Sequence, residues 1–352
     1  MLTKQQFGQM PDGTAVSLFT LGNSKGVEVD ILSLGGIIRS WRLPVAGAKP
    51  IDIVLGFDTL ADYLADQAYL GALVGRYANR IKQGQFELQG ITYQADINQG
   101  GNCLHGGSAG FNSRVWHPQI LNVGDSPSLA LTLTSEDGDQ GFPGRLEVKV
   151  VYTLDKNNTL RIEYFAKADK TTLYNPTQHA YFNLAGHDSG SIASHEVQIL
   201  ASRYTPTDAN AIPIGELADV TATPFDLRAL CPVNLGLNAQ HEQITLGNGY
   251  DHNWCLDAYK TGLGQPKLAA VAVEKQSGRK LSVRTTMPGV QLYTANYLGA
   301  EPSGKAGVAY QNRGGLCFET QYYPDAPNQA HFPSPVLEKD KEFYSVTEYQ
   351  IS

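Results

Sequence analysis

Short runs in which apolar and polar residues alternate are the feature that most restricts how this chain can fold. In residues 146–154 an apolar side chain stands at every second position, and residues 160–166 repeat the pattern. A period of two is typical of strands with one buried face. Residues 155–158 between these runs have turn chemistry, as do residues 276–278, so we predict a β-hairpin at each place.

Glycine and proline favour strands joined by turns over helices joined by loops. The 352 residues include 36 glycines and 18 prolines, which end regular elements. The best helix candidate is short, with Asp58 as its N-cap and Leu60, Tyr63 and Leu64 on one face. We find no βαβ alternation, repeat or linker. The sequence therefore predicts an all-β fold, a large antiparallel β-sandwich with a few short helices, as one domain over residues 1–352.

Composition places the chain among globular proteins and excludes several functions. It is 42% hydrophobic and 17% charged, which is enough for a large core. A net charge of −7 without Lys/Arg runs argues against a nucleic-acid partner. No stretch reaches the ~18 apolar residues of a membrane span, and residues 1–13 lack the apolar region of a secretory signal. We therefore expect a cytoplasmic protein without membrane association.

The cysteines and histidines show no metal-binding pattern. The four cysteines, at positions 103, 231, 255 and 317, form no C-x-x-C pair, so we expect free thiols. The eight histidines include no H-x-H or H-E-x-x-H spacing. The sequence therefore predicts no metal site.

Polar residues interrupt the core pattern in residues 175–184, Asn-Pro-Thr-Gln-His-Ala-Tyr-Phe-Asn-Leu. A strand over this segment places His179, Tyr181 and Asn183 on one face and apolar side chains on the other. The first face is a candidate for chemistry. A single histidine on a sheet is more often structural or solvent-facing, so this segment alone leaves both interpretations open.

The same arrangement recurs near residue 319. Leu316 and Phe318 point to one side of a predicted strand, while Glu319 and Gln321 point to the other. Gln291, between two apolar neighbours, is a third example. Three such strands could line one cleft, although an isolated carboxylate on a sheet is usually solvated.

Other segments carry side chains that suit a polar ligand. His105 lies among glycines that let the backbone approach a ligand. Phe111 and Trp116 could stack on a sugar ring, or the segment could be a turn with a buried aromatic residue. Residues 75–81 hold two arginines and an amide, which are donors for hydroxyl oxygens or for ion pairs on a surface loop. Asp251 could accept from two sugar hydroxyls or form a local turn.

Several blocks, in matching order, resemble the aldose 1-epimerase (galactose mutarotase) family. They are GRYANRI (75–81), LHGG (104–107), DGDQGFPG (137–144), NPTQHAYFNL (175–184), GYDH (249–252), VQLYTAN (290–296) and LCFETQYYPDAPN (316–328). The resemblance extends from about the GRYANRI block to the C-terminal TEY (347–349) and so covers most of the chain. The resemblance implies a β-sandwich of the galactose mutarotase type and a cytoplasmic enzyme that interconverts the α and β anomers of hexoses such as galactose and glucose.

The resemblance also assigns residues. The family's acid falls on His179 and its base on Glu319. The family's sugar-binding positions fall on Asn79, Arg80, His105, Asp251 and Gln291. The chain departs from the family pattern at Cys103, residues 112–113, Gln178 and Ala295, and these departures leave the preferred sugar open.

An acid and a base are what the reaction needs. A cyclic hemiacetal opens when the anomeric hydroxyl loses a proton while the ring oxygen gains one. Glutamate is ordinarily ionised near neutral pH, as Glu319 would be, and His179 can carry a proton there. The predicted partner is a monosaccharide, no cofactor is needed, and the protein is a monomer or homodimer.

Three other functions stay open from the sequence. A glycoside hydrolase could use Glu319 with Asp251 as its second carboxylate. A carbohydrate-binding module would need aromatic platforms but no acid or base. A hexose 6-phosphate enzyme could bind phosphate through Arg76, Arg114 or Arg313.

Overall fold

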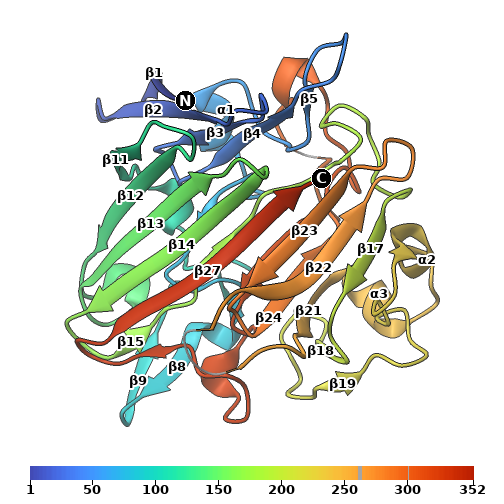
Figure 1. Cartoon of the computed structure of the whole chain (residues 1–352). Coiled ribbons are helices and arrows are strands. Elements are labelled where there is room, and N and C mark those ends of the chain that lie inside the picture. The colour runs from blue at the N-terminus through green and yellow to red at the C-terminus, as the bar shows by residue number, and fades with distance from the viewer. Residues whose placement is uncertain (261–263, 300) are drawn as a thin grey trace.

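A nine-stranded antiparallel sheet forms the largest part of the molecule (Figure 1). The computed structural model describes residues 1–260, 264–299 and 301–352. In spatial order the strands are β11 (His117–Asn122), β12 (Ser128–Ser135), β13 (Leu146–Leu154), β14 (Thr159–Ala168), β27 (Glu342–Ile351), β23 (Lys280–Thr285), β22 (Lys267–Val273), β17 (Glu196–Ile199) and β20 (Cys231–Pro232).

Both predicted hairpins lie in this sheet. Strands β13 and β14 pair with Leu154 opposite Leu160, and the Asp155 carboxylate in the turn accepts the Thr159 backbone N–H at 2.8 Å. Strands β22 and β23 pair in antiparallel fashion on either side of residues 276–278. The two predictions are confirmed.

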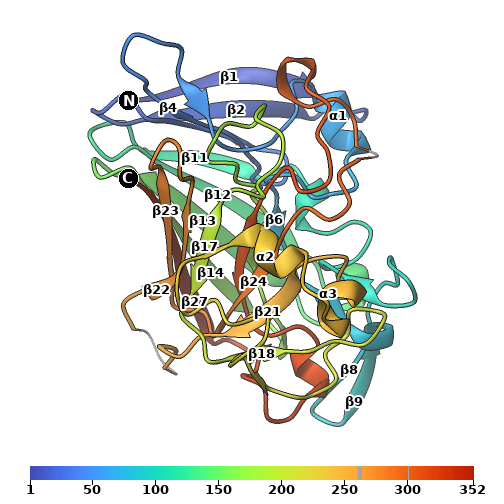
Figure 2. The same cartoon turned by 90° about the vertical axis from the view of Figure 1, so that its right-hand side faces the viewer.

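A five-stranded sheet, which we call the inner sheet, packs against one face of the nine-stranded sheet (Figure 2). Trp254, Leu292 and Phe318 of the inner sheet share a core with Tyr164 and Tyr349 of the larger sheet. The predicted antiparallel sandwich is therefore confirmed. The inner strands are β19 (Ala218–Asp219), β18 (Arg203–Thr205), β21 (Asp251–Cys255), β24 (Gly289–Tyr293) and β25 (Cys317–Gln321).

The N-terminal residues form a separate sheet across one end of the sandwich (Figure 1). Phe19, Val29 and Trp41 of this sheet extend the shared core toward Leu131 and Tyr152. The N-terminal sheet therefore adds a unit that the sequence pattern did not separate from the sandwich. Its strands are β1 (Leu2–Gln9), β2 (Ala15–Gly22), β3 (Glu28–Leu32), β4 (Ile38–Leu43) and β5 (Ile51–Asp52).

Short strand pairs and helices complete the fold. The pairs are β6 (Leu73–Val74) with β16 (Thr177–Gln178), β7 (Arg80–Ile81) with β10 (Cys103–Leu104), β8 (Gln85–Leu88) with β9 (Ile91–Gln94), and β15 (Thr172–Leu173) with β26 (Val336–Leu337). The α-helices are α1 (Leu60–Ala65), α2 (Val233–Leu237) and α3 (Glu242–Leu246), and 3₁₀ turns are η1 (Lys82–Gly84), η2 (Phe111–Ser113), η3 (Asp139–Gly141), η4 (Lys305–Gly307) and η5 (Ala326–Asn328). Within the described ranges no helix is of a length and apolarity that would let it traverse a bilayer.

Helix α1 is the predicted helix, but its cap and its buried face differ from the prediction. Thr59, not Asp58, is the N-cap, and its side chain accepts a first-turn backbone N–H at 3.2 Å. The Asp58 carboxylate lies one residue before the cap and forms an ion pair outside the helix. Leu60 and Tyr63 are buried as predicted, whereas Leu64 is 45% exposed.

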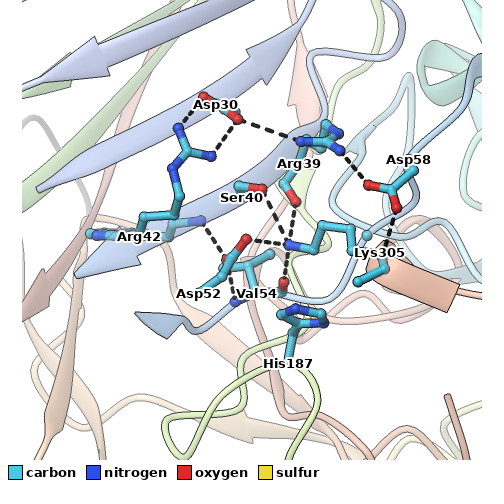
Figure 3. A network of polar contacts seen from close by, with 12 residues as sticks. Asp30, Arg39, Ser40, Arg42, Asp52, Val54, Asp58, His187 and Lys305 are labelled. Atoms are coloured by element: carbon cyan, nitrogen blue, oxygen red, sulfur yellow. Dashed lines mark hydrogen bonds and ion pairs between the residues drawn. The ribbon is translucent and has the colours of Figure 1, made fainter. Parts of the chain in front are cut away.

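A buried lysine ties the connection between β24 and β25 to the N-terminal sheet (Figure 3). Lys305 Nζ donates to the Asp52 carboxylate and the Val54 carbonyl, both at 2.6 Å, and to the Arg39 carbonyl at 3.0 Å. Burial lowers the pKa of Lys305 to about 8, although the charge of Asp52 acts in the opposite direction. These contacts hold the connection that leads into β25.

Candidate active site

Neighbouring strands of the inner sheet bring together residues that are far apart in the sequence. The register pairs Gln291 of β24 with Glu319 of β25, and Tyr293 of β24 with Asp251 of β21. Glu319 is only 2% exposed. The polar face of this strand, which the alternation of apolar and polar residues predicted as the face for chemistry, is therefore buried rather than open to solvent.

His179 reaches the same place from an extended segment beside β25. Phe182 and Leu316 exchange two backbone hydrogen bonds of 2.8 Å, and the His179 backbone N–H donates to the Ala72 carbonyl at 2.9 Å. Regular strand covers only Thr177–Gln178. Beyond it the chain stays paired only through isolated β-bridges, in which Phe182 pairs with Val54 and Leu316. The predicted strand is thus shorter, but its apolar face lies in the core as expected.

The imidazole and the carboxylate lie side by side. His179 Nε2 is 3.6 Å from Glu319 Oε1, and the two side chains are 5% and 3% exposed. Aromatic rings surround the histidine, with the Tyr181 ring centroid 5.1 Å and the Tyr69 ring centroid 6.1 Å from that of His179. Exclusion of bulk water strengthens electrostatic interactions at such a site.

A second histidine, His105, directly follows β10, which pairs with β7. The Asn79 backbone N–H donates to His105 Nδ1 at 3.1 Å, and the His105 backbone N–H donates to the Asn79 carbonyl at 3.1 Å. A neutral imidazole that accepts a hydrogen bond at Nδ1 carries its own hydrogen on Nε2. His105 therefore offers a fixed N–H donor to a ligand. Arg80 is held nearby, where its Nε donates to Gln99 Oε1 at 2.8 Å.

These residues line one cavity of about 180 Å³. That volume is below the ~300–1,000 Å³ of sites for drug-sized ligands, so it favours a small ligand. All the predicted site residues except Gln291 line it. The lining also includes polar and aromatic residues that the sequence did not indicate as binding residues, namely Gln67, Tyr69, Gln99, Tyr293 and Tyr297.

Burial shifts the pKa values of His179 and Glu319 in opposite directions. It lowers the pKa of His179 to about 4, because removal from water penalises the charged imidazolium. Burial, together with the negative charge of Asp251, raises the pKa of Glu319 well above its ordinary value. Burial also lowers the pKa of His105. Both shifts favour the uncharged form, which is the neutral imidazole for His179 and the carboxylic acid for Glu319.

Gln291 lies behind Asp251 rather than in the cavity. Gln291 Nε2 donates to Asp251 Oδ1 at 2.7 Å, and Gln291 is 2% exposed. On the other side, the Arg80 guanidinium lies 3.9 Å from Asp251 Oδ2. The Gln291 hydrogen bond and the positive charge of Arg80 thus orient the Asp251 carboxylate, and Gln291 acts on the cavity through that carboxylate.

The two histidines and the glutamate also form a group that a metal ion could fit. One ligand atom from each of His105, His179 and Glu319 lies within 4.8 Å of the others. The hydrogen bond from the Asn79 backbone N–H occupies Nδ1 of His105, so the neutral ring carries its hydrogen on Nε2. Neither ring nitrogen then has a free lone pair for a metal ion, which argues against coordination by His105. These residues fit hydrogen bonding to a ligand better than metal coordination.

A wider groove of about 810 Å³ lies on the outer face of the nine-stranded sheet. Its charged residues, such as Glu147, Lys149 and Lys167, are exposed. Exposed side chains keep their ordinary solvation and lack the environment that tunes acids and bases. We therefore assign the chemistry to the smaller cavity.

Comparisons with known proteins agree with this geometry. The family model "Aldose 1-epimerase" matches residues 17–350. The chain belongs to the aldose 1-epimerase family. The galactose mutarotase of Bos taurus is 43% identical over 352 residues, which are 100% of this chain and 98% of that protein. The aldose 1-epimerase of Escherichia coli K12 is 38% identical over 342 residues, which are 97% and 96% of the two chains.

Solved structures of aldose epimerases have the same fold. The galactose 1-epimerase of Lactobacillus acidophilus NCFM has a TM-score of 0.86 at 26% identity, with 100% of this chain and 98% of that chain covered. An aldose epimerase homologue from C. elegans has a TM-score of 0.84 at 29% identity, with 95% and 98% covered. The family and the β fold predicted from the sequence are therefore confirmed.

The aromatic residues predicted as candidates for ring stacking, Phe111 and Trp116, do not line the cavity. Phe111 and Trp116 pack edge to face in the core, with ring centroids 5.5 Å apart. Tyr69 and Tyr297 line the cavity instead, and the Tyr69 ring centroid is 4.7 Å from that of His105. Both tyrosines come from irregular loops, so no periodic pattern marks them. Tyr293, two residues after Gln291, could have been found by alternation along its strand.

The three arginines predicted as candidates for phosphate binding are also outside the cavity. Arg76 is buried and donates to backbone carbonyls, including Pro143 and Gly144, both at 2.9 Å. Arg114 forms an ion pair at 2.6 Å with an aspartate in η3. Arg313 hydrogen-bonds to the Asn248 carbonyl and the Asn296 side chain. Each guanidinium has a structural partner that explains its position.

Proposed function

We propose that this protein interconverts the α and β anomers of free hexoses such as galactose and glucose by opening and reclosing the sugar ring. The observation that carries this proposal is the buried contact of 3.6 Å between His179 Nε2 and Glu319 Oε1 in a small cavity. The anomeric hydroxyl and the ring oxygen are bonded to the same carbon, so an acid and a base this close can each reach one of them. Membership of the aldose 1-epimerase family supports the same reaction.

In the proposed mechanism Glu319 accepts the proton of the anomeric hydroxyl while His179 donates one to the ring oxygen. The bond between C1 and the ring oxygen breaks, and an open-chain aldehyde forms. Rotation about the C1–C2 bond turns the other aldehyde face toward the ring hydroxyl. Reclosure with the two roles reversed yields the other anomer. General acid and base catalysis typically contribute ~10²- to 10⁴-fold each.

The proton count of the pair suits this cycle. With cyclic sugar bound, the active form is the imidazolium with the carboxylate, and after ring opening it is the neutral imidazole with the carboxylic acid. Both forms hold one proton. Burial disfavours the charged form of each group, which makes His179 a strong acid and Glu319 a strong base when they are charged. No cofactor enters the cycle.

The other cavity residues are proposed to bind the sugar. The Nε2–H of His105 is a fixed donor for a ring or hydroxyl oxygen, since Asn79 occupies Nδ1. Asp251 can accept from sugar hydroxyls in the orientation set by Arg80 and Gln291. Asn79 and Arg80 complete a mixed set of donors and acceptors at the cavity wall.

The alternative functions have less support. A glycoside hydrolase would need Asp251 as a second catalytic carboxylate, but Asp251 is held by Gln291 at 2.7 Å and the group beside Glu319 is His179. A binding module would not need a buried acid and base. A site for a 6-phosphate would need a free guanidinium, whereas the three arginines considered are engaged elsewhere.

Polarimetry of freshly dissolved α-D-galactose and α-D-glucose tests the proposal. We expect the protein to speed the approach to anomeric equilibrium, and to do so equally in EDTA. Nitrophenyl β-galactoside should release no nitrophenol, and glucose 6-phosphate should react more slowly than glucose. Tight sugar binding without faster mutarotation would contradict the proposal.

We also propose a cytoplasmic protein that meets its monosaccharide as a monomer or homodimer. The four cysteines are free thiols, and Cys103, Cys255 and Cys317 are buried. Unpaired thiols are typical of reducing compartments. Size-exclusion chromatography with light scattering distinguishes the two oligomeric states.

A further inference from the structure

The catalytic histidine has a second polar contact on the side away from the glutamate. Cys317 Sγ lies 3.6 Å from His179 Nδ1, within hydrogen-bond range for sulfur, and both side chains are buried. Cys317 and Glu319 are two residues apart on β25, so they point to the same face of the strand. One strand thus places the base at Nε2 and a thiol at Nδ1.

Backbone hydrogen bonds fix the main chain that carries the imidazole. The His179 backbone N–H donates to the Ala72 carbonyl at 2.9 Å, and the Gly71 backbone N–H donates to the His179 carbonyl at 3.0 Å. Tyrosine rings lie against the imidazole, which favours one rotamer. The ring orientation leaves Nδ1 for Cys317 and Nε2 for Glu319 and the ligand.

The partner at Nδ1 is uncharged. Burial raises the pKa of the Cys317 thiol well above its ordinary value, and the nearby Glu319 acts in the same direction. A neutral thiol is a weak hydrogen-bond donor and a weak acceptor. It therefore orients the ring without the strong stabilisation of the imidazolium that a carboxylate would supply.

We propose that Cys317 is a positioning residue whose sulfur accepts the Nδ1–H of His179 and so reserves Nε2 for proton exchange with the sugar. The inference rests on the proposed function. An imidazolium that gives its Nε2 proton to the ring oxygen keeps its other hydrogen on Nδ1. In ring closure Nε2 must be bare to take that proton back. The same tautomer, with hydrogen on Nδ1, serves both directions.

The two cavity histidines then carry opposite tautomers, each set by its partner at Nδ1. His105 faces a backbone N–H from Asn79, which can only donate, so its hydrogen lies on Nε2. His179 faces a sulfur that can accept. This difference makes His105 a permanent donor to the sugar and His179 the residue that exchanges a proton.

Nitrogen NMR of the whole protein, labelled with ¹⁵N-histidine and free of sugar at neutral pH, tests the tautomers directly. His179→Gln and His105→Gln variants assign the two sets of signals. We expect a protonated Nδ1 and a bare Nε2 for His179, and the reverse for His105. A protonated Nε2 on His179 in the wild-type protein would overturn the inference without touching the proposed reaction.

Variants of Cys317 supply the kinetic test. Cys317→Ala should lower kcat roughly three- to tenfold, the size expected for one neutral hydrogen bond, while KM stays within about twofold and the His179 signals show mixed tautomers. Cys317→Ser, which restores an acceptor, should recover most of kcat and the wild-type tautomer. Cys255→Ala removes another buried thiol, at the end of β21, and should change neither readout. Wild-type kcat and an unchanged tautomer in Cys317→Ala would contradict the inference.

Discussion

His179 and Glu319 differ from most residues of their types because neighbouring side chains remove them from water. Alternation along the chain predicted the direction in which each side chain points, since a period of two assigns faces. It did not predict the burial of the polar face. That face is covered by loops from other parts of the chain, including residues 67–69. The shifted ionisation of the pair therefore depends on contacts that no local pattern encodes.

As the proposed acid and base, His179 and Glu319 together predict a bell-shaped dependence of kcat/KM on pH, because the proposed cycle uses the pair with one proton. As the pH falls toward the pKa of His179, about 4, a second proton binds and Glu319 can no longer act as the base. As the pH rises through the raised pKa of Glu319, the proton is lost and His179 can no longer act as the acid. Initial rates over a pH series, corrected for spontaneous mutarotation, measure both limbs. A flat profile would argue against the pair.

Replacing Asp251 by asparagine should have two effects. Loss of the negative charge lowers the pKa of Glu319, so the basic limb moves to lower pH. Loss of a charged hydrogen bond to the sugar raises KM on the order of tenfold. Gln291→Met is the matched control, because it keeps the charge but removes the donor at 2.7 Å. Gln291→Met should raise KM without moving the basic limb of the pH profile. A basic limb that stays in place in Asp251→Asn would contradict the predicted effect of the Asp251 charge on the pKa of Glu319.

Among the elements, hairpins could be predicted and distant strand pairs could not. The turn at Asp155 joins β13 and β14 within a few residues, so its chemistry is visible locally. By contrast, β14 pairs with β27 so that Thr159 lies opposite Gln350, and no local pattern indicates this. The position of Glu319 beside Gln291 likewise depends on long-range pairing. Family resemblance supplied that information when the residues alone did not.

The connection between β24 and β25 should depend on Lys305. Lys305→Met leaves Asp52 buried without its cation and leaves the Val54 carbonyl without a donor. Removal of one partner of a buried ion pair typically costs ~3–5 kcal/mol in the free energy of unfolding. Denaturant titration measures the change.

Two further variants make this prediction specific. Lys275→Met removes an exposed lysine that pairs with Glu196 at 2.6 Å, and it should cost less than about 1 kcal/mol. Adding Asp52→Asn to Lys305→Met should recover part of the loss, because no unpaired charge is then buried. Equal stabilities of Lys305→Met and Lys275→Met would contradict the anchoring role.

For the whole molecule, the period-two pattern and the turn residues were enough to predict an antiparallel sandwich. They did not predict that β1–β5 form a separate sheet at one end, because all strands share the same local pattern. The core is continuous across all three large sheets, from Trp41 through Tyr164 to Trp254. This continuity supports the prediction of one domain over residues 1–352.

One cooperative unfolding transition follows from that continuity. In calorimetry the measured enthalpy should equal the van't Hoff enthalpy, which is the criterion for a single unfolding unit. Mutarotase activity should be lost in the same transition, since the cavity draws on β7, β21 and β25. Two separate transitions, with the N-terminal sheet melting first, would contradict a single domain.

The mutarotation rate of Glu319→Gln, with sugar binding followed by calorimetry, tests the proposed mechanism most directly. The amide keeps the shape of the side chain but cannot act as the base. We predict a fall in kcat of about 100-fold or more, because a general base typically contributes ~10²- to 10⁴-fold, with galactose affinity little changed. A rate within twofold of the wild-type value would contradict the assignment of Glu319 as the base and, with it, the proposed mechanism.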